Sequence, residues 1–125
     1  IGIDIVKVSR IEKLIQRFGE KGLSRFLSSK EIEQSNNQPH RIAGYWAVKE
    51  ATSKALGVGI GQYFSFKDIE ITYDKYGRPI AQLSDEVVER FGIEEIAISI
   101  SHDGDYSIGV VTITIKHGNI SQNQL

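Results

Sequence analysis

The chain has 125 residues and a mass of 14.0 kDa, a length typical of one domain. Its 15 basic and 16 acidic residues give a formal net charge of -1, which argues against a general nucleic-acid coat but allows a local basic patch. The absence of cysteine excludes disulfides, thiolate zinc sites and a cysteine nucleophile. No apolar run approaches the roughly 20 residues of a membrane span and no signal peptide is visible, so we expect a cytoplasmic protein.

The first 20 residues predict a strand followed by a helix. Residues 1–8 alternate in polarity, and one face of the strand carries three isoleucines, Ile1, Ile3 and Ile5. Ser9 and Glu12 have the spacing of a capping box, which predicts that the helix begins there. Gly19 is expected to end it.

Two more helices are predicted before residue 58. Ser28 and Glu31 again have capping-box spacing and predict a short helix. The longest helix is predicted over residues 41–56, with Gly57 as its end. Small residues recur along it every four positions, which allows a close approach of another backbone or a ligand: Ala43, Ala47, Ala51 and Ala55.

The second half predicts two hairpins around one short helix. The first hairpin covers residues 69–83, a helix capped by Ser84 follows, and the second hairpin covers residues 96–115. Helices and strands are largely segregated, so we predict an α+β fold with a mainly antiparallel sheet packed against the long central helix. We expect a single domain over residues 1–115 and a flexible polar tail over residues 116–125.

Asp4 and the long helix offer the first candidates for chemistry. A carboxylate at Asp4 in an apolar strand needs a partner or a metal, unless that face is open to solvent. Trp46, Glu50 and Lys54 lie on one stripe of the helix, where Glu50 and Lys54 also have the spacing of an ordinary surface ion pair. Lys49 adjoins Glu50 but points about 100° away.

The glycines of residues 57–61 do not form a dinucleotide-binding loop. Such loops follow a strand and precede a helix, so that phosphate meets the positive helix N-terminus, whereas these glycines follow a helix. Ser101, His102 and Asp103 do not form a hydrolytic triad, because neighbours in a strand point to opposite faces. His102 is suited to donate a hydrogen bond or a charge to a phosphate, or it is a half-exposed turn histidine.

A basic stripe on the first predicted helix is formed by Arg10, Lys13 and Arg17, spaced three and four residues apart. Such a stripe is usually a solvated face. In a net-acidic protein it can also dock an acidic partner.

Three segments together resemble the signatures of the holo-acyl-carrier-protein synthases, the small bacterial type of 4′-phosphopantetheinyl transferase. They are GIDIV at residues 2–6, WAVKEA at 46–51 with KALG at 54–57, and SISHD at 99–103. Each motif alone is weak, but their order and spacing in a chain of this length are specific. The similarity covers the chain to about Lys116 and implies the 4′-phosphopantetheinyl transferase fold.

The resemblance implies transfer of the phosphopantetheine arm of coenzyme A to a serine of apo acyl carrier protein, as part of fatty acid biosynthesis. Adenosine 3′,5′-bisphosphate is released and Mg²⁺ is required. The family forms homotrimers with active sites between subunits. The resemblance makes Asp4 and Glu50 the metal ligands, a pair that suits an ion preferring hard oxygen donors. Lys54 would act with them on the phosphates.

The resemblance also assigns the substrate contacts. The nucleotide end of coenzyme A would meet Ser101 and His102, and the loop carrying Gly57, Gly59 and Gly61 would line the same cleft. The basic stripe Arg10, Lys13 and Arg17 would meet the acidic recognition helix of the carrier protein. Many members have arginine where this chain has Tyr45, and Arg41, one turn earlier, is the expected replacement for its phosphate contact.

Two other functions fit the residues. A Mg²⁺-dependent nucleotide pyrophosphate hydrolase would use the same carboxylates but would not need the basic stripe. A non-catalytic module that binds coenzyme A or a carrier protein would catalyse no reaction, so replacing either carboxylate would remove no turnover.

Overall fold

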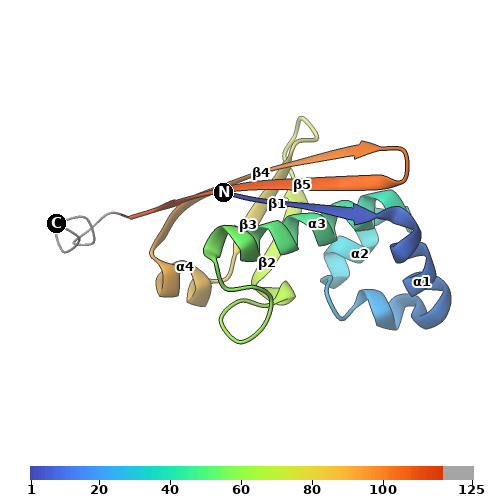
Figure 1. Cartoon of the computed structure of the whole chain (residues 1–125), viewed down its shortest axis with the longest axis horizontal. Helices are drawn as coiled ribbons and strands as arrows, with labels where there is room; N and C mark the ends of the chain where they lie inside the picture. The colour runs from blue at the N-terminus through green and yellow to red at the C-terminus, as the bar shows by residue number, and fades with distance from the viewer. Residues whose placement is uncertain (117–125) are drawn as a thin grey trace.

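The computed structural model describes residues 1–116 (Figure 1). Except for Lys116, the predicted polar tail lies outside the described residues. The elements, in chain order, are β1 (Gly2–Lys7), α1 (Val8–Leu23), α2 (Ser29–Ser35), α3 (Pro39–Leu56), η1 (Phe66–Asp68), β2 (Ile69–Tyr73), β3 (Pro79–Leu83), α4 (Asp85–Phe91), β4 (Ile93–Asp103) and β5 (Tyr106–Ile115). No helix in this part of the chain is long and apolar enough to cross a membrane.

The strands form two antiparallel sheets, which confirms the predicted α+β fold. One sheet has the order β1-β5-β4, and the other is the β2-β3 hairpin. Asp4 of β1 pairs with Gly109 of β5, and His102 of β4 pairs with Ser107 of β5. The two candidate residues therefore stand on the two outer strands of one sheet.

Helix α3 packs against one face of this sheet at very short range (Figure 1). A Cβ atom added at Gly2 would lie 1.9 Å from the Ala51 carbonyl oxygen, and one at Gly109 would lie 2.6 Å from the Val48 backbone nitrogen. Only glycine allows these two close approaches. The alanine stripe of α3 thus serves contact with the strand backbones, as its spacing predicted.

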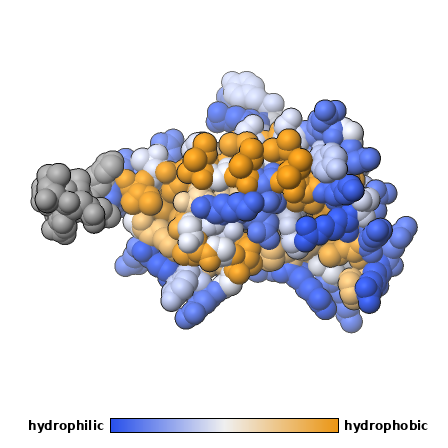
Figure 2. Space-filling view, in the orientation of Figure 1, coloured by the Kyte–Doolittle hydropathy of each residue, from blue (hydrophilic) through white to orange (hydrophobic). Residues whose placement is uncertain are grey.

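The opposite face of the same sheet is apolar and uncovered in the single chain. Ile1, Ile3 and Ile5 are 86%, 60% and 57% exposed. They alternate with Gly2, Asp4 and Val6, which turn toward α3. Figure 2 shows hydrophobic side chains gathered along the strands of this sheet.

The start of α1 differs from the prediction. The helix begins at Val8, and its N-cap residue Lys7 makes no side-chain capping bond, so the predicted capping box of Ser9 and Glu12 is wrong. The reason is that β1 runs directly into the helix. The Val8 backbone N–H is already satisfied by the Asp105 carbonyl oxygen, 2.7 Å away in the turn between β4 and β5.

The other predicted helix boundaries agree more closely with the structure. Gly19 breaks the helix with φ 59°, as expected, but helical turns resume and continue to Leu23. The capping box of Ser28 and Glu31 is present. Helix α3 starts at Pro39, two residues earlier than predicted, and ends at Gly57 in the left-handed conformation.

A buried ion pair joins α3 to the elements beside it. Lys49 Nζ lies 2.8 Å from Glu31 Oε1, and both side chains are almost completely buried. The ammonium also donates to the carbonyl oxygens of Phe26 and Phe66, at 2.8 and 3.0 Å. Glu31 Oε2 accepts from the Ile71 backbone N–H at 2.8 Å. This pair therefore connects α2, α3, η1 and β2.

Candidate functional site

Asp4 and Lys54 form an ion pair across β1 and α3. Lys54 Nζ lies 2.9 Å from Asp4 Oδ1 and 3.2 Å from the Ile3 carbonyl oxygen. The Lys54 side chain is 55% exposed and that of Asp4 is 17% exposed. Lys54 therefore pairs with Asp4, and the ordinary helical ion pair with Glu50 is not formed. A shallow hollow lined by Ile3, Asp4, Ile5, Lys54 and Ile108 opens beside this pair.

Glu50 completes a cluster of two carboxylates and two cations. Its side chain is half-buried, and burial, followed by the negative charge of Asp4, raises its pKa above the ordinary value. The positive charges of Lys54 and Arg10 oppose that rise in pKa. The carboxylates of Asp4 and Glu50 are thus close enough to repel each other, an arrangement that a cation relieves.

The donor set suits magnesium better than zinc. Residues 1–116 contain no group of three or more His, Cys, Asp and Glu side chains placed to hold a metal, which argues against a closed protein cage there. Mg²⁺ is typically held by one or two carboxylates, with waters and substrate phosphates as its other ligands. Asp4 and Glu50 fit that pattern.

The basic stripe begins beside this cluster. The Arg10 guanidinium lies 5.2 Å from the centroid of the Trp46 ring, one turn before Glu50 on α3, a favourable cation–π distance. Lys13 and Arg17 are exposed farther along α1. The stripe therefore runs outward from the two carboxylates.

An aromatic side chain accompanies the stripe. Phe18 follows the buried Ile11 by seven residues, two helical turns along the same face of α1, yet it is 44% exposed. The guanidinium groups of Arg17 and Arg25 lie 5.3 and 5.4 Å from its ring centroid. The outer surface of α1 thus combines positive charge with one apolar ring.

The glycine loop follows directly after Lys54. Gly57 and Gly59 have φ angles of 76° and 71°, which favour glycine, and Gly61 donates its backbone N–H to the Phe64 carbonyl oxygen at 2.7 Å. All three glycines are exposed. The loop therefore begins three residues after Lys54, at the C-terminal end of α3.

A second candidate region lies at the other end of α3. Arg41, Tyr45, Tyr73, Pro79, Ile100 and His102 line a groove there. Tyr45 is completely buried, and its hydroxyl lies 2.9 Å from that of Tyr73. Burial and this hydrogen bond raise the pKa of Tyr45 far above its usual range, so its hydroxyl stays neutral. The positive charge of Arg41 in this groove is therefore not offset by a tyrosinate. Ser101 is exposed on the opposite side of β4 from His102.

The two regions are separate within one chain. Asp4 and His102 stand on the outer strands β1 and β4, with β5 between them. Along α3, Arg41 and Glu50 are nine residues apart, or roughly 13 Å at 1.5 Å per residue. The two candidate regions therefore lie toward opposite ends of α3.

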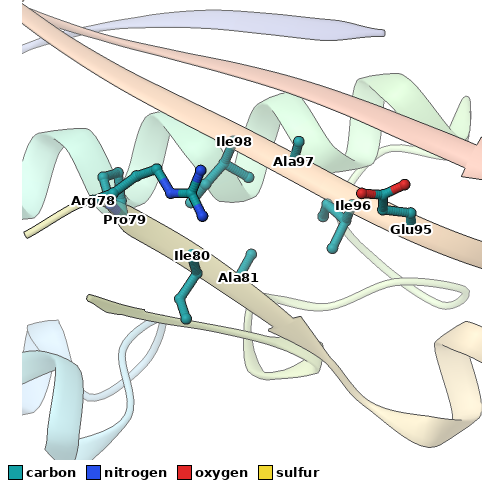
Figure 3. Close-up of a pocket in the computed structure, with 8 residues that line it drawn as sticks. All are labelled: Arg78, Pro79, Ile80, Ala81, Glu95, Ile96, Ala97 and Ile98. Carbon is teal, nitrogen blue, oxygen red and sulfur yellow. The ribbon is translucent and has the colours of Figure 1, made fainter. Parts of the chain in front are cut away.

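A further pocket lies between β3 and β4 and is drawn in Figure 3. It is lined by Arg78, Pro79, Ile80, Ala81, Glu95, Ile96, Ala97 and Ile98. None of the candidate residues lines this pocket.

Sequence reasoning missed the role of one polar residue and placed another only in part. Lys49, expected to point away from Glu50, is buried in the ion pair with Glu31. Ser107 belongs to none of the sequence motifs, yet it is fully buried and its Oγ lies 2.7 Å from His102 Nδ1. His102 and Ser107 are five residues apart in the chain, and only the register in which β4 and β5 pair sets them opposite each other.

Comparison with known proteins identifies the class. The model of the 4′-phosphopantetheinyl transferase superfamily matches residues 1–111, so this chain belongs to that superfamily. It is 53% identical to the holo-[acyl-carrier-protein] synthase of Sulfurimonas denitrificans over 120 residues, which are 95% of this chain and 98% of that protein. It is 48% identical to the enzyme of the same name from Wolinella succinogenes, over 90% of this chain and 95% of that one.

A solved structure agrees with this result. The crystal structure of Helicobacter pylori holo-[acyl-carrier-protein] synthase in complex with coenzyme A matches with a TM-score of 0.88 and 47% identity. The match covers 90% of this chain and 98% of that one.

Proposed function

We propose that Asp4 and Glu50 hold a Mg²⁺ ion with which this chain transfers 4′-phosphopantetheine from coenzyme A to a serine of apo acyl carrier protein. The protein is a holo-[acyl-carrier-protein] synthase in its activity, as its relatives over nearly their whole length are. The observation that carries the metal assignment is that the carboxylates of Asp4 on β1 and Glu50 on α3 lie within electrostatic reach of each other: burial, and then the charge of Asp4, raise the pKa of Glu50. Mg²⁺ is the hard cation that such an oxygen pair accepts.

The reaction is a displacement at phosphorus. The serine oxygen of the carrier protein forms a bond to the β-phosphorus of coenzyme A, and the bond from that phosphorus to the bridging oxygen breaks. Adenosine 3′,5′-bisphosphate leaves with the bonding electrons, and the serine proton passes to a base. When bound, Mg²⁺ supplies charge neutralisation on the pyrophosphate.

The side chains of the cluster then act as follows. Lys54 is exposed, and its ammonium contacts only the Asp4 carboxylate and the Ile3 carbonyl oxygen, so it can turn from them toward a phosphate oxygen. Its four-carbon stem allows that movement. The exposed glycines of residues 57–61 leave room for substrate beside it.

We assign the nucleotide end of coenzyme A to the groove that contains Arg41 and His102. The groove offers one fixed cation and one titratable ring, a combination suited to a phosphate monoester. Arg41 Nη1 donates to the Gln34 carbonyl oxygen at 3.1 Å, which orients its guanidinium. Ser101, on the opposite side of β4, would contact substrate from another direction.

We assign the carrier protein to the outer surface of α1. Arg10, Lys13 and Arg17 supply positive charge for an acidic helix, and Phe18 supplies an apolar contact between two guanidinium groups. Because the stripe starts at Arg10, beside Trp46 and Glu50, a protein docked there would bring its serine toward the carboxylates.

We also propose that the working unit is a homotrimer. The exposed isoleucines of β1 form an apolar face next to the hollow that contains Asp4 and Lys54. A second copy that covers this face would border the carboxylate cluster. The separation of the two candidate regions, toward opposite ends of α3, supports an active site shared between subunits. A cytoplasmic location stays a prediction.

Metal binding is the direct test of the carboxylate assignment. Calorimetric titration of Mg²⁺ into the protein saturated with coenzyme A should give one strong site in the wild type. Asp4→Asn and Glu50→Gln should each weaken it at least tenfold, since even indirect partners of metal ligands cost about 10–100-fold. Glu12→Gln, an exposed carboxylate on α1, is the matched control. Unchanged affinity in both site variants would contradict the assignment.

The two competing functions give different products. A pyrophosphate hydrolase would release free 4′-phosphopantetheine from coenzyme A without any carrier protein, whereas a binding module would leave coenzyme A intact in every mixture. Coenzyme A consumption that requires apo acyl carrier protein fits neither.

A further inference from the structure

Ser107 makes two polar contacts that the transfer reaction leaves unused. It lies on β5 directly opposite His102 and is fully buried. Its Oγ donates to the His40 carbonyl oxygen at 2.7 Å. The same Oγ lies 2.7 Å from His102 Nδ1.

These two contacts together fix the tautomer of His102. A serine hydroxyl has one proton, and a carbonyl oxygen can only accept, so that proton points to His40. Toward His102 the Ser107 oxygen must therefore accept, which places the proton of the neutral imidazole on Nδ1. His102 Nε2 is left with a lone pair. Within residues 1–116 no hydrogen-bond partner of Nε2 is found, and the ring is exposed in the groove with Arg41.

We propose that Ser107 is a positioning residue that holds His102 in the Nδ1–H form, so that His102 binds a phosphate only by taking up a proton at Nε2. The inference rests on the proposed function, which brings the nucleotide end of coenzyme A to this groove. A bare Nε2 lone pair repels an anionic oxygen. Once protonated, the same nitrogen donates a charge-assisted hydrogen bond.

The surroundings of the ring keep it neutral before a phosphate arrives. It is faced by His40, Arg41 and Tyr45 of α3, by Tyr73 of β2 and by Ser107 of β5. Partial burial of the ring against the groove, followed by the charges of His40 and Arg41, lowers the pKa of His102 below its ordinary 6.5. Above pH 6.5 the His102 ring of the free protein is therefore mostly neutral. A bound phosphate must raise the pKa of the ring in order to protonate it.

Proton linkage gives the sign and size of the effect. Between the low pKa of free His102 and the raised pKa of the complex, affinity for the phosphate falls as pH rises, by up to about tenfold per pH unit. Without the Ser107 hydroxyl, the neutral ring can adopt the Nε2–H form and donate without a proton. The pH dependence that His102 contributes should then disappear.

The tautomer can be observed without ligand or substitution. Nitrogen-15 NMR of the wild-type protein above pH 7 should show a protonated Nδ1 and an unprotonated Nε2 for His102, with His102→Gln assigning the signals. An Nε2–H form in the wild type would overturn the inference and leave the proposed function standing.

The linkage is measured by binding of adenosine 3′,5′-bisphosphate without metal, using calorimetry in two buffers of different ionisation enthalpy at pH 7–8. The wild type should take up a larger fraction of a proton than Ser107→Ala, and Ser107→Thr, which keeps the hydroxyl, should restore the uptake. Ser99→Ala, an exposed serine on β4, is the control. Equal uptake in the wild type and Ser107→Ala would overturn the inference. No binding to the wild type would overturn both this linkage and the placement of the nucleotide.

Discussion

Two lysines five residues apart on α3 should respond in opposite ways to the same substitution. Lys49 is buried against Glu31 with three hydrogen bonds from its ammonium, at 2.8, 2.8 and 3.0 Å. Lys49→Met leaves the buried Glu31 carboxylate without a cation, which typically costs about 3–5 kcal/mol. For a chain of this size, that corresponds to a fall in Tm of roughly 10–20 °C.

Lys54 provides the contrast, because its side chain is 55% exposed, so water and salt screen its ion pair with the less exposed Asp4. Lys54→Met should cost about 0–1 kcal/mol of stability, a shift in Tm of a few degrees at most. Its loss should instead lower the transfer rate, by about 10²-fold if the ammonium acts on a phosphate in the transition state. Lys49→Met, assayed well below its Tm, should keep most of its turnover.

The assay combines thermal unfolding with single-turnover transfer to apo acyl carrier protein at low temperature. The double variant Lys49→Met/Glu31→Gln removes both charges and should be more stable than the sum of the single variants predicts. The reasoning is refuted if Lys49→Met keeps the wild-type Tm and loses turnover, because Lys49 would then serve the substrate and not the fold.

Three further predictions follow from the site and the surface. Glu50→Gln should raise the stability of the metal-free protein at neutral pH while removing transfer. Because burial and the charge of Asp4 raise the pKa of Glu50, the wild type should lose stability as pH rises from 4.5 through that raised pKa. Urea unfolding measured across this pH range should show the loss in the wild type and not in Glu50→Gln. Arg10→Glu/Arg17→Glu should raise the KM for the carrier protein much more than that for coenzyme A, whereas Lys75→Glu, exposed on the β2–β3 turn, should change neither; equal effects would argue against docking on α1. Ile3→Asp/Ile5→Asp should shift the protein toward monomers in analytical ultracentrifugation and reduce transfer, and an unchanged mass would contradict assembly through this face.

The sequence predicted the elements well because local signals decide them. The alternation of the strands, the caps at Ser28 and Ser84, and the helix end at Gly57 all depend on signals within a few residues. The capping box at Ser9 failed because the Val8 N–H is satisfied by Asp105, about a hundred residues away in the chain. No local pattern contains that contact.

The candidate site was predictable only in part, for the same reason. Asp4 and Glu50 were found from their residue types and from the family resemblance. That Lys54 pairs with Asp4, while Lys49 turns into the core, depends on the rotation of α3 against the sheet, which Gly2 and Gly109 set by their close contacts. The tautomer of His102 depends on a neighbouring strand, because it requires Ser107.

The central claim is tested most directly by the intact mass of apo acyl carrier protein after incubation with this protein, coenzyme A and Mg²⁺. The account predicts a gain of one phosphopantetheine group per carrier protein, release of adenosine 3′,5′-bisphosphate, and no gain when EDTA replaces the metal or when Asp4→Asn/Glu50→Gln replaces the wild type. A carrier protein of unchanged mass in the complete mixture, or a full gain in the presence of EDTA, would contradict it.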